Sequence, residues 1–341
     1  MTGQRIYRSS NACLLAVQAV DAPRVVTSAA FDERLAVTYR RLGMRPGLLE
    51  RVVGIRERRW WADDVTYADG AAMAGAKALA ESGIDATQIG LMVNTSVSQA
   101  HLEPSTAVAV HHSLGLGPHC LNFDVANACL GFVNGIQIAT AMIDCGQIDY
   151  ALVVNGEDAR AVQEATIARL SGPQVTATQV MDEFATLTLG SGAAATVLGP
   201  ADRHPEGHRV VGGATRASTE HHALCVGDIE MIRTDSKLLL EAGLELSAAL
   251  WEGAAEEFDW AAGMDRYIIH QISQVHTSAL CRTLGIDEAR VPLTFPLYGN
   301  IGPASVPYTL AKEVQDLKAG DRVLLMGIGS GLNASCTEIR W

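Results

Sequence analysis

The feature that most constrains the fold of this sequence is a pattern that occurs twice. Residues 89–99 resemble residues 265–274, and residues 146–156 resemble residues 320–327. Within each pair the second segment follows the first by about 172–175 residues, for example 320 − 146 = 174. A repeat of this length indicates two copies of one α/β unit packed face to face. Chance similarity between apolar strands is the alternative interpretation.

Apolar segments typical of buried strands alternate with alanine-rich helical segments, which predicts α/β layers with a largely parallel sheet. Residues 157–185 interrupt this alternation with two helix-like stretches, and we expect an insertion there that covers one face of the sheet. The polar loop at 200–208 predicts a division into halves at 1–199 and 209–341. The expected strands are 90–95, 150–154, 266–270 and 322–326, and the expected helices are 69–82, 234–258 and 275–284.

Composition excludes several classes of protein. The chain has 341 residues and a net charge of −12, which argues against non-specific binding to nucleic acid. Its seven cysteines follow no disulfide-like spacing and form no recognisable metal motif, which favours a reduced, cytoplasmic location. We find neither a signal peptide nor an apolar run long enough to span a membrane.

Cys129 precedes a segment that predicts a buried helix. A helix that is apolar on every side belongs in the interior of a large domain. A cysteine in its first turn would lie near unpaired N–H groups and the positive end of the helix dipole, which favour the nucleophilic thiolate. A buried, inert cysteine is an equally good interpretation of this segment alone. The apolar residues are Leu130, Phe132, Val133, Ile136, Ile138, Ala139, Met142 and Ile143.

Two further polar residues follow predicted strands or turns of the second half. His270 ends a buried strand, where a histidine can act as a base or hydrogen-bond donor, although most histidines are structural. Asn300 lies in a glycine-containing turn 171 residues after Cys129 (300 − 129), so the two occupy equivalent places in the repeat. Both would then lie at helix N-termini that meet at a pseudo-twofold axis. Alternatively, Asn300 only caps its helix.

Charged residues at two other places are candidates. Glu103 stands before Pro104 at the start of a predicted helix, where a surface carboxylate is the ordinary interpretation. Four arginines gather within nine residues and could bind phosphate groups, or form a solvated face with paired charges. These are Arg51, Arg56, Arg58 and Arg59.

Taken in order, these motifs resemble the thiolase superfamily. Asn127-Ala-Cys129, His270-Gln271 and Tyr298-Gly-Asn300 are similar to β-ketoacyl-ACP synthase III. Other segments resemble the OleA branch more closely, in which two long-chain acyl-CoA molecules are joined head to head. They are Leu102-Glu-Pro-Ser-Thr-Ala107, His270-Gln-Ile-Ser273 and Gly299-Asn-Ile-Gly-Pro-Ala-Ser-Val-Pro307.

The resemblance implies a duplicated thiolase-like fold, layered α-β-α-β-α with two mixed, largely parallel sheets. It implies that Cys129 takes up an acyl group from a CoA thioester, in an oxyanion hole formed by the backbone N–H groups of Cys129 and Gly331. His270 and Asn300 would hold the carbonyl oxygen of the second substrate. Because a simple acyl-CoA has no carboxylate to lose, a base is needed, and Glu103 would supply it in the partner subunit.

The expected reaction is therefore a non-decarboxylative Claisen condensation that gives a β-keto acid for olefin or β-lactone biosynthesis. The expected partners are long-chain acyl-CoA and a second copy of the chain, or a paralogue in a heterodimer, with no cofactor, metal, nucleic acid or transmembrane segment. One alternative is a synthase III-like enzyme with a malonyl donor. Another is a non-catalytic subunit, although such a subunit would be expected to have lost at least one of the four candidate residues.

Overall fold

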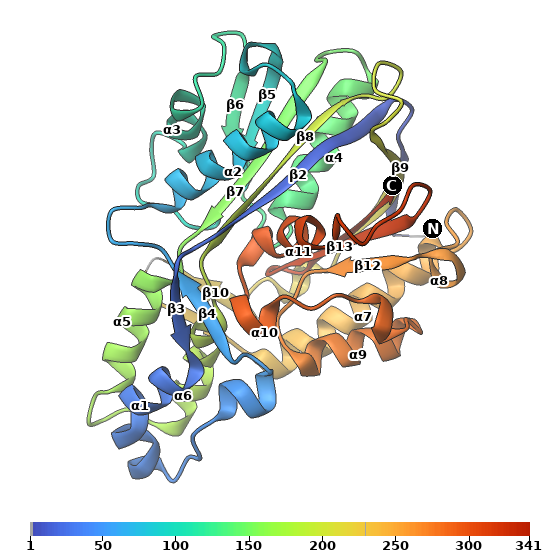
Figure 1. Cartoon of the computed structure of the whole chain (residues 1–341). Helices are drawn as coiled ribbons and strands as arrows, with labels where there is room; N and C mark the ends of the chain where they lie inside the picture. The colour runs from blue at the N-terminus through green and yellow to red at the C-terminus, as the bar shows by residue number, and fades with distance from the viewer. Residues whose placement is uncertain (1–2, 229) are drawn as a thin grey trace.

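A computed structural model describes residues 3–228 and 230–341, and in them ten strands form one mixed sheet (Figure 1). Two short hairpins stand apart from it, β3 (Arg24–Thr27) with β4 (Glu57–Trp60) and β10 (Cys225–Gly227) with β11 (Ile232–Thr234). The strands of the sheet are β1 (Arg5–Arg8), β2 (Ala12–Asp21), β5 (Ile89–Asn94), β6 (Leu121–Asp124), β7 (Tyr150–Glu157), β8 (Gly192–Pro200), β9 (His208–Ala217), β12 (Arg266–Ile269), β13 (Arg322–Gly329) and β14 (Asn333–Arg340).

The strand order reads almost the same from either side of the centre, as the repeat predicts. It runs β12-β13-β14-β9-β2-β8-β7-β5-β6, so β12-β13-β14-β9 mirrors β5-β7-β8-β2. The pairing directions agree as well, because β5–β7 and β12–β13 are parallel whereas β7–β8 and β13–β14 are antiparallel. The two repeated strands at 89–94 and 150–157 thus correspond to those at 266–269 and 322–329. The internal repeat is therefore structural.

The expectation of two largely parallel sheets differs from the structure in two respects. The two parts are joined edge to edge, because Cys13 and Leu14 of β2 pair with Arg209 and His208 of β9. Antiparallel pairs also predominate, since only β5–β6, β5–β7 and β12–β13 are parallel in the described residues. β13 and β14 are joined by a short turn, which can connect only antiparallel strands. In addition, β1 pairs with β9, so the start of the chain extends the C-terminal part of the sheet.

Helices lie in three layers around the two parts of the sheet, which gives the expected α-β-α-β-α arrangement. The inner layer consists of α4 (Gly131–Asp144) and α11 (Ser305–Glu313). The outer layers are α2 (Tyr67–Ser82) with α3 (Thr106–Ser113), and α7 (Ser236–Ala254) with α9 (Gln274–Leu284). The expected helices at 69–82, 234–258 and 275–284 correspond to α2, α7 and α9. Among the described helices none is long and apolar enough to cross a bilayer.

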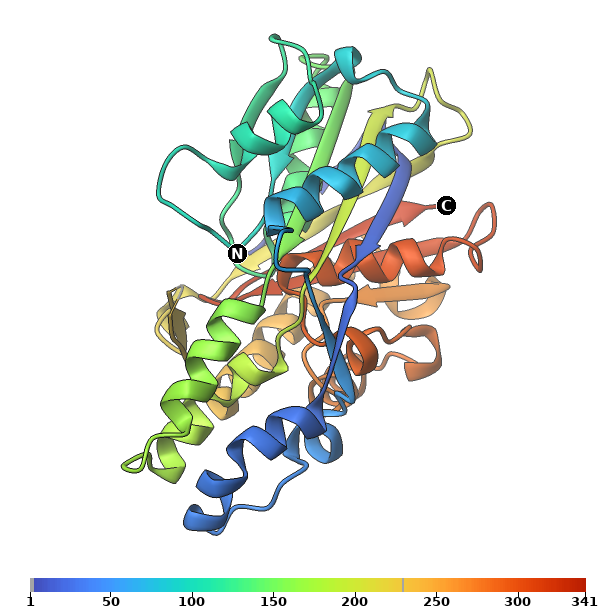
Figure 2. The ribbon, with the colours of Figure 1, turned by 60° about the vertical axis from the view of Figure 1, so that its left-hand side comes forward.

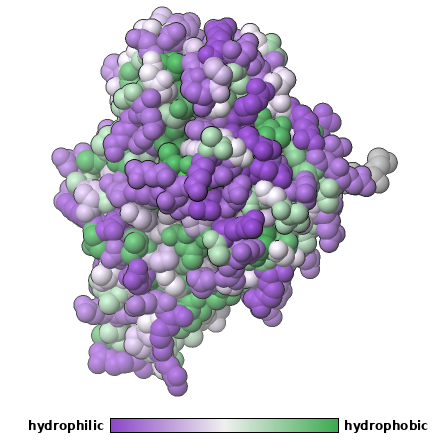
Figure 3. All heavy atoms as spheres, turned by 45° about the vertical axis from the view of Figure 1, so that its right-hand side comes forward, coloured by the Kyte–Doolittle hydropathy of each residue, from purple (hydrophilic) through white to green (hydrophobic). Residues whose placement is uncertain are grey.

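The strands are apolar on both faces because each face packs on helices. In β7, Ala151 and Val153 contact the inner core around α4, whereas Leu152 and Val154 contact the outer core around α2. Successive side chains of a strand point to opposite faces, so the side chains on both faces of β7 are buried. The all-round apolar sequence of α4 has the same cause, since sheet lies on both of its sides. The outer surface in Figure 3 is instead mostly hydrophilic, with scattered hydrophobic side chains.

The predicted insertion contains helices α5 (Arg160–Leu170) and α6 (Ala177–Glu183), followed by the short turn η3 (Phe184–Thr188). It does not cover a face of the sheet as expected. Its apolar side chains pack instead against α1 (Ser28–Leu42) and η1 (Leu49–Val53), a second insertion that the sequence pattern did not reveal. Figures 1 and 2 both place α1, α5 and α6 together beyond one end of the sheet. The remaining short elements are η2 (Ala86–Gln88), η4 (Thr219–His221), α8 (Trp260–Gly263), η5 (Glu288–Arg290), α10 (Phe295–Tyr298) and η6 (Gly302–Ala304).

One close backbone approach ties the two halves together and yields a stability prediction. The Gly190 N–H donates to the Asn300 carbonyl at 2.9 Å, and a Cβ on Gly190 would lie 1.9 Å from the Tyr298 carbonyl oxygen. We expect Gly190→Ala to lower the free energy of unfolding by about 3 kcal/mol, because backbone cannot yield as a side chain can. Gly192→Ala is the matched control, since its Cβ would meet only ordinary contacts at 3.5 Å and beyond. Chemical denaturation of both variants tests this, and equal stabilities would contradict it.

Candidate active site

Cys129 lies on a strained turn between β6 and α4. Ala128, the residue before it, has φ of 45°, in the left-handed region that non-glycine residues rarely adopt. Two turn hydrogen bonds hold this conformation, from Leu130 N–H to the Asn127 carbonyl at 3.0 Å and from Gly131 N–H to the Ala128 carbonyl at 3.1 Å. Cys129 therefore lies just before the helix cap, at Leu130, rather than in the first turn as predicted. Such local strain is found preferentially at functional sites.

The end of strand β13 packs directly on the Cys129 turn. A Cβ on Gly329 would lie 2.8 Å from the Asn127 carbonyl oxygen, and one on Gly327 would lie 2.6 Å from Cδ1 of Leu130. Glycine is needed at position 329, where the neighbouring atom belongs to the backbone. Gly331 follows in the turn between β13 and β14, with φ of 84°. The turn that contains Gly331 therefore begins beside the nucleophile turn.

His270 continues the buried strand β12, as predicted. Its N–H donates to the Met326 carbonyl at 2.8 Å, and only 3% of the residue is exposed. Burial, with the nearby His276 as a second cause, lowers the pKa of His270 to about 3, so the imidazole is neutral at physiological pH. Its Nδ1 atom has no hydrogen-bond partner within the described residues. A neutral imidazole can donate one N–H to a substrate oxygen without carrying a charge into the site.

Asn300 lies in the turn that precedes the inner helix α11. Its side-chain oxygen accepts a hydrogen bond from Gly302 N–H at 3.0 Å, which leaves the amide Nδ2 group as its donor. The backbone of Gly302 also lies close enough to His270 to influence the pKa of its imidazole. Cys129 and Asn300 thus precede the two inner helices, α4 and α11, as the repeat predicts. His270 and Asn300, which are 30 residues apart (300 − 270), meet at Gly302.

Gln271 fixes this arrangement, and the sequence analysis assigned it no role. Its side chain is buried and donates to the Pro292 carbonyl at 2.7 Å. Its oxygen accepts from the N–H groups of Thr294 at 2.8 Å and Phe295 at 3.1 Å. One side chain therefore joins the end of β12 to the segment that leads to Asn300. The signal in the sequence was an amide side chain, which can donate and accept hydrogen bonds, directly after His270.

Glu157 is the second residue that the sequence analysis missed. It ends β7, is 7% exposed, and burial raises the pKa of its carboxyl group to about 7. A Cβ on Gly302 would lie 3.5 Å from the Glu157 carboxyl carbon, and the Glu157 charge is felt by Cys129. A titratable carboxyl group therefore lies among the candidate site residues. A glutamate that ends an apolar strand was the only signal in the sequence.

The protonation state of Cys129 differs from the prediction. Part of the residue remains accessible, yet burial of the sulfur raises the pKa of the Cys129 thiol to about 12, and the Glu157 charge adds to this effect. The helix dipole was expected to lower it. Because Cys129 lies outside the first turn, desolvation of the thiolate outweighs the attraction of the helix N-terminus. The resting site therefore holds a neutral thiol.

Glu103 lies apart from the other candidates. It is exposed on the loop between β5 and α3, next to Leu102, which is 98% exposed. The end of this loop is fixed by Asp124, which accepts from the N–H groups of Thr106 at 2.9 Å and Ala107 at 2.8 Å. Within the described residues, Glu103 is therefore a solvent-exposed side chain with no hydrogen bond or ion pair to Cys129 or His270.

The four arginines do not form one binding surface. Arg58 is fully buried and donates to the Leu187 carbonyl at 3.0 Å and the Ser28 hydroxyl at 3.1 Å, so it is structural. Arg59 pairs with Glu57 at 2.8 Å. Arg51 is exposed but donates to backbone carbonyls of its own turn, and Arg56 is exposed. Neighbouring residues of strand β4 point to opposite sides, which separates Arg58 from Arg59. Arg51 and Arg56 remain candidates for binding the phosphates of CoA.

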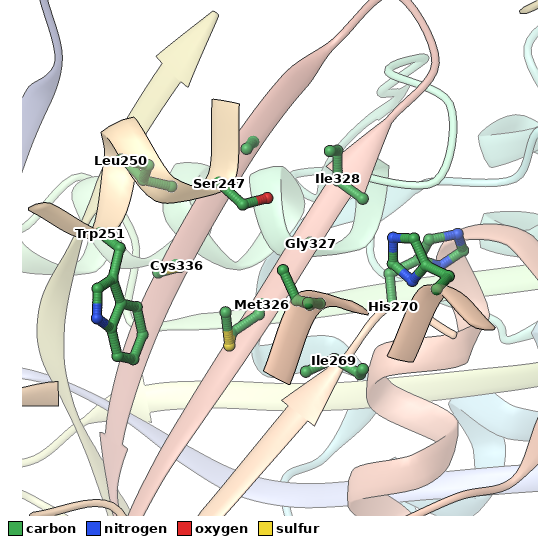
Figure 4. Close-up of a pocket in the computed structure, with 12 residues that line it drawn as sticks. Ser247, Leu250, Trp251, Ile269, His270, Met326, Gly327, Ile328 and Cys336 are labelled. Carbon is green, nitrogen blue, oxygen red and sulfur yellow. The ribbon is translucent and has the colours of Figure 1, made fainter. Parts of the chain in front are cut away.

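A narrow apolar pocket opens beside His270 (Figure 4). It lies between helices α7 and α9 and the strands β12–β14, with His270 at one end and Trp251 at the other. Between them lie Ile269, Met326 and Gly327. The lining is apolar, but the free volume of about 20 Å³ leaves room for little more than a water molecule. Among residues 3–228 and 230–341, no cluster of His, Cys, Asp and Glu is arranged to hold a metal ion.

Comparison with known proteins defines first the class and then the family. Residues 123–218 match the model of 3-oxoacyl-[acyl-carrier-protein] synthase III, and residues 261–341 match the model of its C-terminal region. Both fall on the segments that carry Cys129, His270 and Asn300. The fold and these matches define a thiolase-superfamily acyltransferase of the synthase III type.

The nearer relatives are acyl-CoA:acyl-CoA alkyltransferases. The enzyme of Xanthomonas campestris pv. campestris is 46% identical over 97% of this chain and 99% of its own length, and that of Shewanella oneidensis is 34% identical over 94% and 96%. A β-ketoacyl-ACP synthase III of Enterobacter is 29% identical over 84% of this chain and 88% of its own. The chain belongs to the acyl-CoA:acyl-CoA alkyltransferase, or OleA, family.

Solved structures agree with this assignment. A cysteine-to-serine variant of Xanthomonas campestris OleA with bound lauric acid and lauroyl-CoA superposes with a TM-score of 0.95 at 46% identity, covering 97% of this chain and 99% of that one. The cerulenin-bound enzyme superposes with a TM-score of 0.96 at 46% identity, covering 98% of each chain. Further structures of that enzyme carry single substitutions of a histidine or a glutamate. The thiolase-like fold is therefore confirmed.

The neutral Cys129 thiol yields a pH prediction. Only the thiolate reacts with iodoacetamide, so with a pKa of about 12 the alkylation rate of Cys129 should rise about tenfold per pH unit from pH 7 to 9, without a plateau. Peptide mass spectrometry after timed alkylation measures this rate. Cys145, which is exposed, serves as the internal control. A plateau in the Cys129 rate below pH 8 would mean that the helix end stabilises the thiolate after all.

Proposed function

We propose that this chain catalyses the non-decarboxylative Claisen condensation of two long-chain acyl-CoA molecules through an acyl-Cys129 intermediate. The observation that carries the proposal is the meeting of His270 and Asn300 at Gly302 beside the strained Cys129 turn. It occurs in a chain 46% identical to an acyl-CoA:acyl-CoA alkyltransferase. The substrates are CoA thioesters and no further cofactor takes part. We also propose a cytoplasmic location.

In the first half-reaction, the Cys129 sulfur attacks the thioester carbonyl of one acyl-CoA. A C–S bond to Cys129 forms, the C–S bond to CoA breaks, and the thiol proton leaves with the CoA sulfur. Because the resting thiol is neutral, its proton must be displaced as the attack proceeds. The backbone N–H groups of Cys129 and Gly331 would stabilise the oxyanion that develops on the carbonyl oxygen.

In the second half-reaction, another acyl-CoA loses a proton from the carbon next to its carbonyl. Neutral His270 and the Asn300 amide would each donate a hydrogen bond to the enolate oxygen. The enolate carbon attacks the carbonyl carbon of the acyl-cysteine, a C–C bond forms, and the C–S bond to Cys129 breaks. Cys129 leaves as a thiolate, which the proton taken up by the base can return to the neutral thiol. The resulting β-ketoacyl-CoA is hydrolysed to a β-keto acid, a precursor of an olefin or a β-lactone. Glu103 of the partner subunit would accept the proton from the second acyl-CoA.

The surface of the chain supports assembly with a second copy. β6 is an edge strand with an unpaired side, and such edges pair readily with another chain. Exposed apolar side chains occur on the same strand and on α3 and the loop before it, namely Leu121, Val108, Leu102 and Val97. We propose a homodimer with β6 at the interface, which would bring each Glu103 loop to the partner. A paralogue with the same edge would give a heterodimer.

Product analysis with one defined acyl-CoA tests the reaction. Lauroyl-CoA alone, without a malonyl donor, should give the β-keto acid with two alkyl chains and the ketone formed when it loses CO₂. Mass spectrometry detects both compounds, and also one acyl group on Cys129. A requirement for malonyl-CoA would favour a decarboxylative synthase III-like enzyme instead. Absence of both product and acyl-Cys129 would favour a non-catalytic subunit.

Two variants serve as controls in this assay. Cys129→Ser should form no product, since a serine hydroxyl has no thiolate character at neutral pH. His270→Ala should still acylate Cys129 but form product about 10²–10³-fold more slowly, because it removes a donor to the enolate. Slow acylation of Cys129, followed by normal condensation once Cys129 is acylated, would contradict this role for His270.

Mixed dimers test the base. Glu103→Gln should keep acylation and lose condensation, since an amide keeps the shape but cannot take the proton. Chains with Glu103→Ala mixed with chains with Cys129→Ala should regain product, because each mixed dimer contains one site with Cys129 from one chain and Glu103 from the other. A confirmed heterodimer without activity would refute action in the partner's site. A fully active Glu103→Gln enzyme would refute the base itself.

A further inference from the structure

The proposed mechanism leaves one buried titratable group of the site without a function, namely Glu157. Its two carboxyl oxygens are held by four donors. One oxygen accepts from Val97 N–H at 2.8 Å and from the Asn155 side chain at 3.2 Å. The other accepts from Ser98 N–H at 3.1 Å and the Ser98 hydroxyl at 2.7 Å. The four donors satisfy both oxygens, as burial of a carboxyl group requires.

Three of the four donors belong to one short segment, and that segment begins the loop that carries Glu103. After Val97 and Ser98, the N–H of Ala100 donates to the Tyr67 hydroxyl at 2.8 Å. The loop ends where Asp124 accepts from the first N–H groups of α3. The loop is therefore held at both ends by carboxyl groups, and its exposed tip at Leu102 and Glu103 lies between these anchors.

The other side of Glu157 faces the chain's own site. A Cβ on Gly302 would be 3.5 Å from the Glu157 carboxyl carbon, so the carboxyl group packs on the turn that Asn300 holds. Its charge also raises the pKa of the Cys129 thiol. Glu157 thus lies between the root of the Glu103 loop and the site that contains Cys129.

We propose that Glu157 is a positioning residue that fixes the root of the loop and so aims Glu103 at the site of the partner subunit. The inference rests on the proposed function, in which Glu103 acts as the base across the interface. It assigns Glu157 to condensation in the neighbouring site, although its side chain lies beside the nucleophile of its own chain.

The chemistry of the anchor explains why a carboxylate is needed. An ionised carboxylate only accepts hydrogen bonds and can satisfy all four donors. A glutamine of the same shape would direct its own N–H groups at N–H donors, and the bonds to Val97 or to Ser98 would be lost. Glu157→Gln also removes the charge that opposes thiolate formation at Cys129. The two half-reactions should therefore respond in opposite directions.

The first experiment measures both half-reactions in Glu157→Gln. Single-turnover acylation of Cys129 should be as fast as in the natural sequence or faster, whereas condensation should fall about tenfold to a hundredfold, the effect of lost charge-assisted hydrogen bonds. Ser98→Ala is the matched control, because it removes one donor and keeps the carboxylate, and it should lower condensation less. Should Glu157→Gln fail to fold, Ser98→Ala still tests whether loosening the loop root lowers the rate of condensation. Equal losses of acylation and condensation would indicate general disruption and overturn the proposal.

The second experiment locates the effect within the dimer. The reference is the mixed dimer of Cys129→Ala and Glu103→Ala chains, in which the first chain supplies Glu103 and the second supplies Cys129. Glu157→Gln is placed in one chain or the other. We expect loss of condensation only when it lies in the chain that supplies Glu103.

The outcomes separate this proposal from the function on which it rests. Two outcomes with an active reference dimer would overturn the positioning role. One is that condensation is lost only when Glu157→Gln lies in the chain that supplies Cys129. The other is that Glu157→Gln lowers condensation in neither chain. An inactive reference dimer with acylated Cys129 would refute action of Glu103 across the interface, and the role of Glu157 with it.

Discussion

The burial of α4 and α11 between the two parts of the sheet is the constraint on which the rest of the structure depends. The central core joins Phe132 and Ile136 of α4 to Val306 and Leu310 of α11, together with strands from both halves. Removal of this apolar surface from water favours only an arrangement in which both helices are covered on all sides. Because the two helices are related by the repeat, the turns that precede them are brought to equivalent places. Cys129 and Asn300 occupy those turns.

Burial also sets the protonation of the site. It lowers the pKa of His270 to about 3, and raises the pKa of Glu157 to about 7 and that of Cys129 to about 12. Each shift favours the neutral form, as expected where water is excluded. His270 and Cys129 are thus neutral at physiological pH, whereas Glu157 is divided between its two forms. Neutral donors that are already in place are suited to stabilising a charge that develops only during the reaction. Both oxygens of Glu157 are already held by four donors, so this carboxyl group is not free to take a proton from a substrate, which is consistent with a proton acceptor that enters from another subunit.

The sequence predicted the elements that follow from periodicity and from ordered motifs. The repeat, the strand ends at His270 and the turn at Asn300 are all found where expected, because local patterns determine them. What depends on distant neighbours was missed. Arg58 was grouped with exposed arginines because the strands of the hairpin β3–β4 are too short to show a hydrophobic periodicity. This hairpin turns Arg58 inward, where it donates to the Leu187 carbonyl. The pKa of Cys129 was expected to fall because helix position can be read from sequence, whereas desolvation cannot.

The strain at Ala128 must be offset elsewhere, and a chain of half-buried amide side chains provides a means. Asn127 donates to the Asn134 side chain at 2.7 Å, and Asn134 donates to Gln137 at 2.9 Å. Gln137 donates to Ser335 of β14, so the turn before Cys129 is tied through α4 to the other half of the sheet. Left-handed backbone at a non-glycine residue costs of the order of 1–3 kcal/mol, and a few net hydrogen bonds of about 1 kcal/mol each are enough to balance it. The nucleophile turn is thereby held by the same junction of two halves that places Asn300 and His270 beside it.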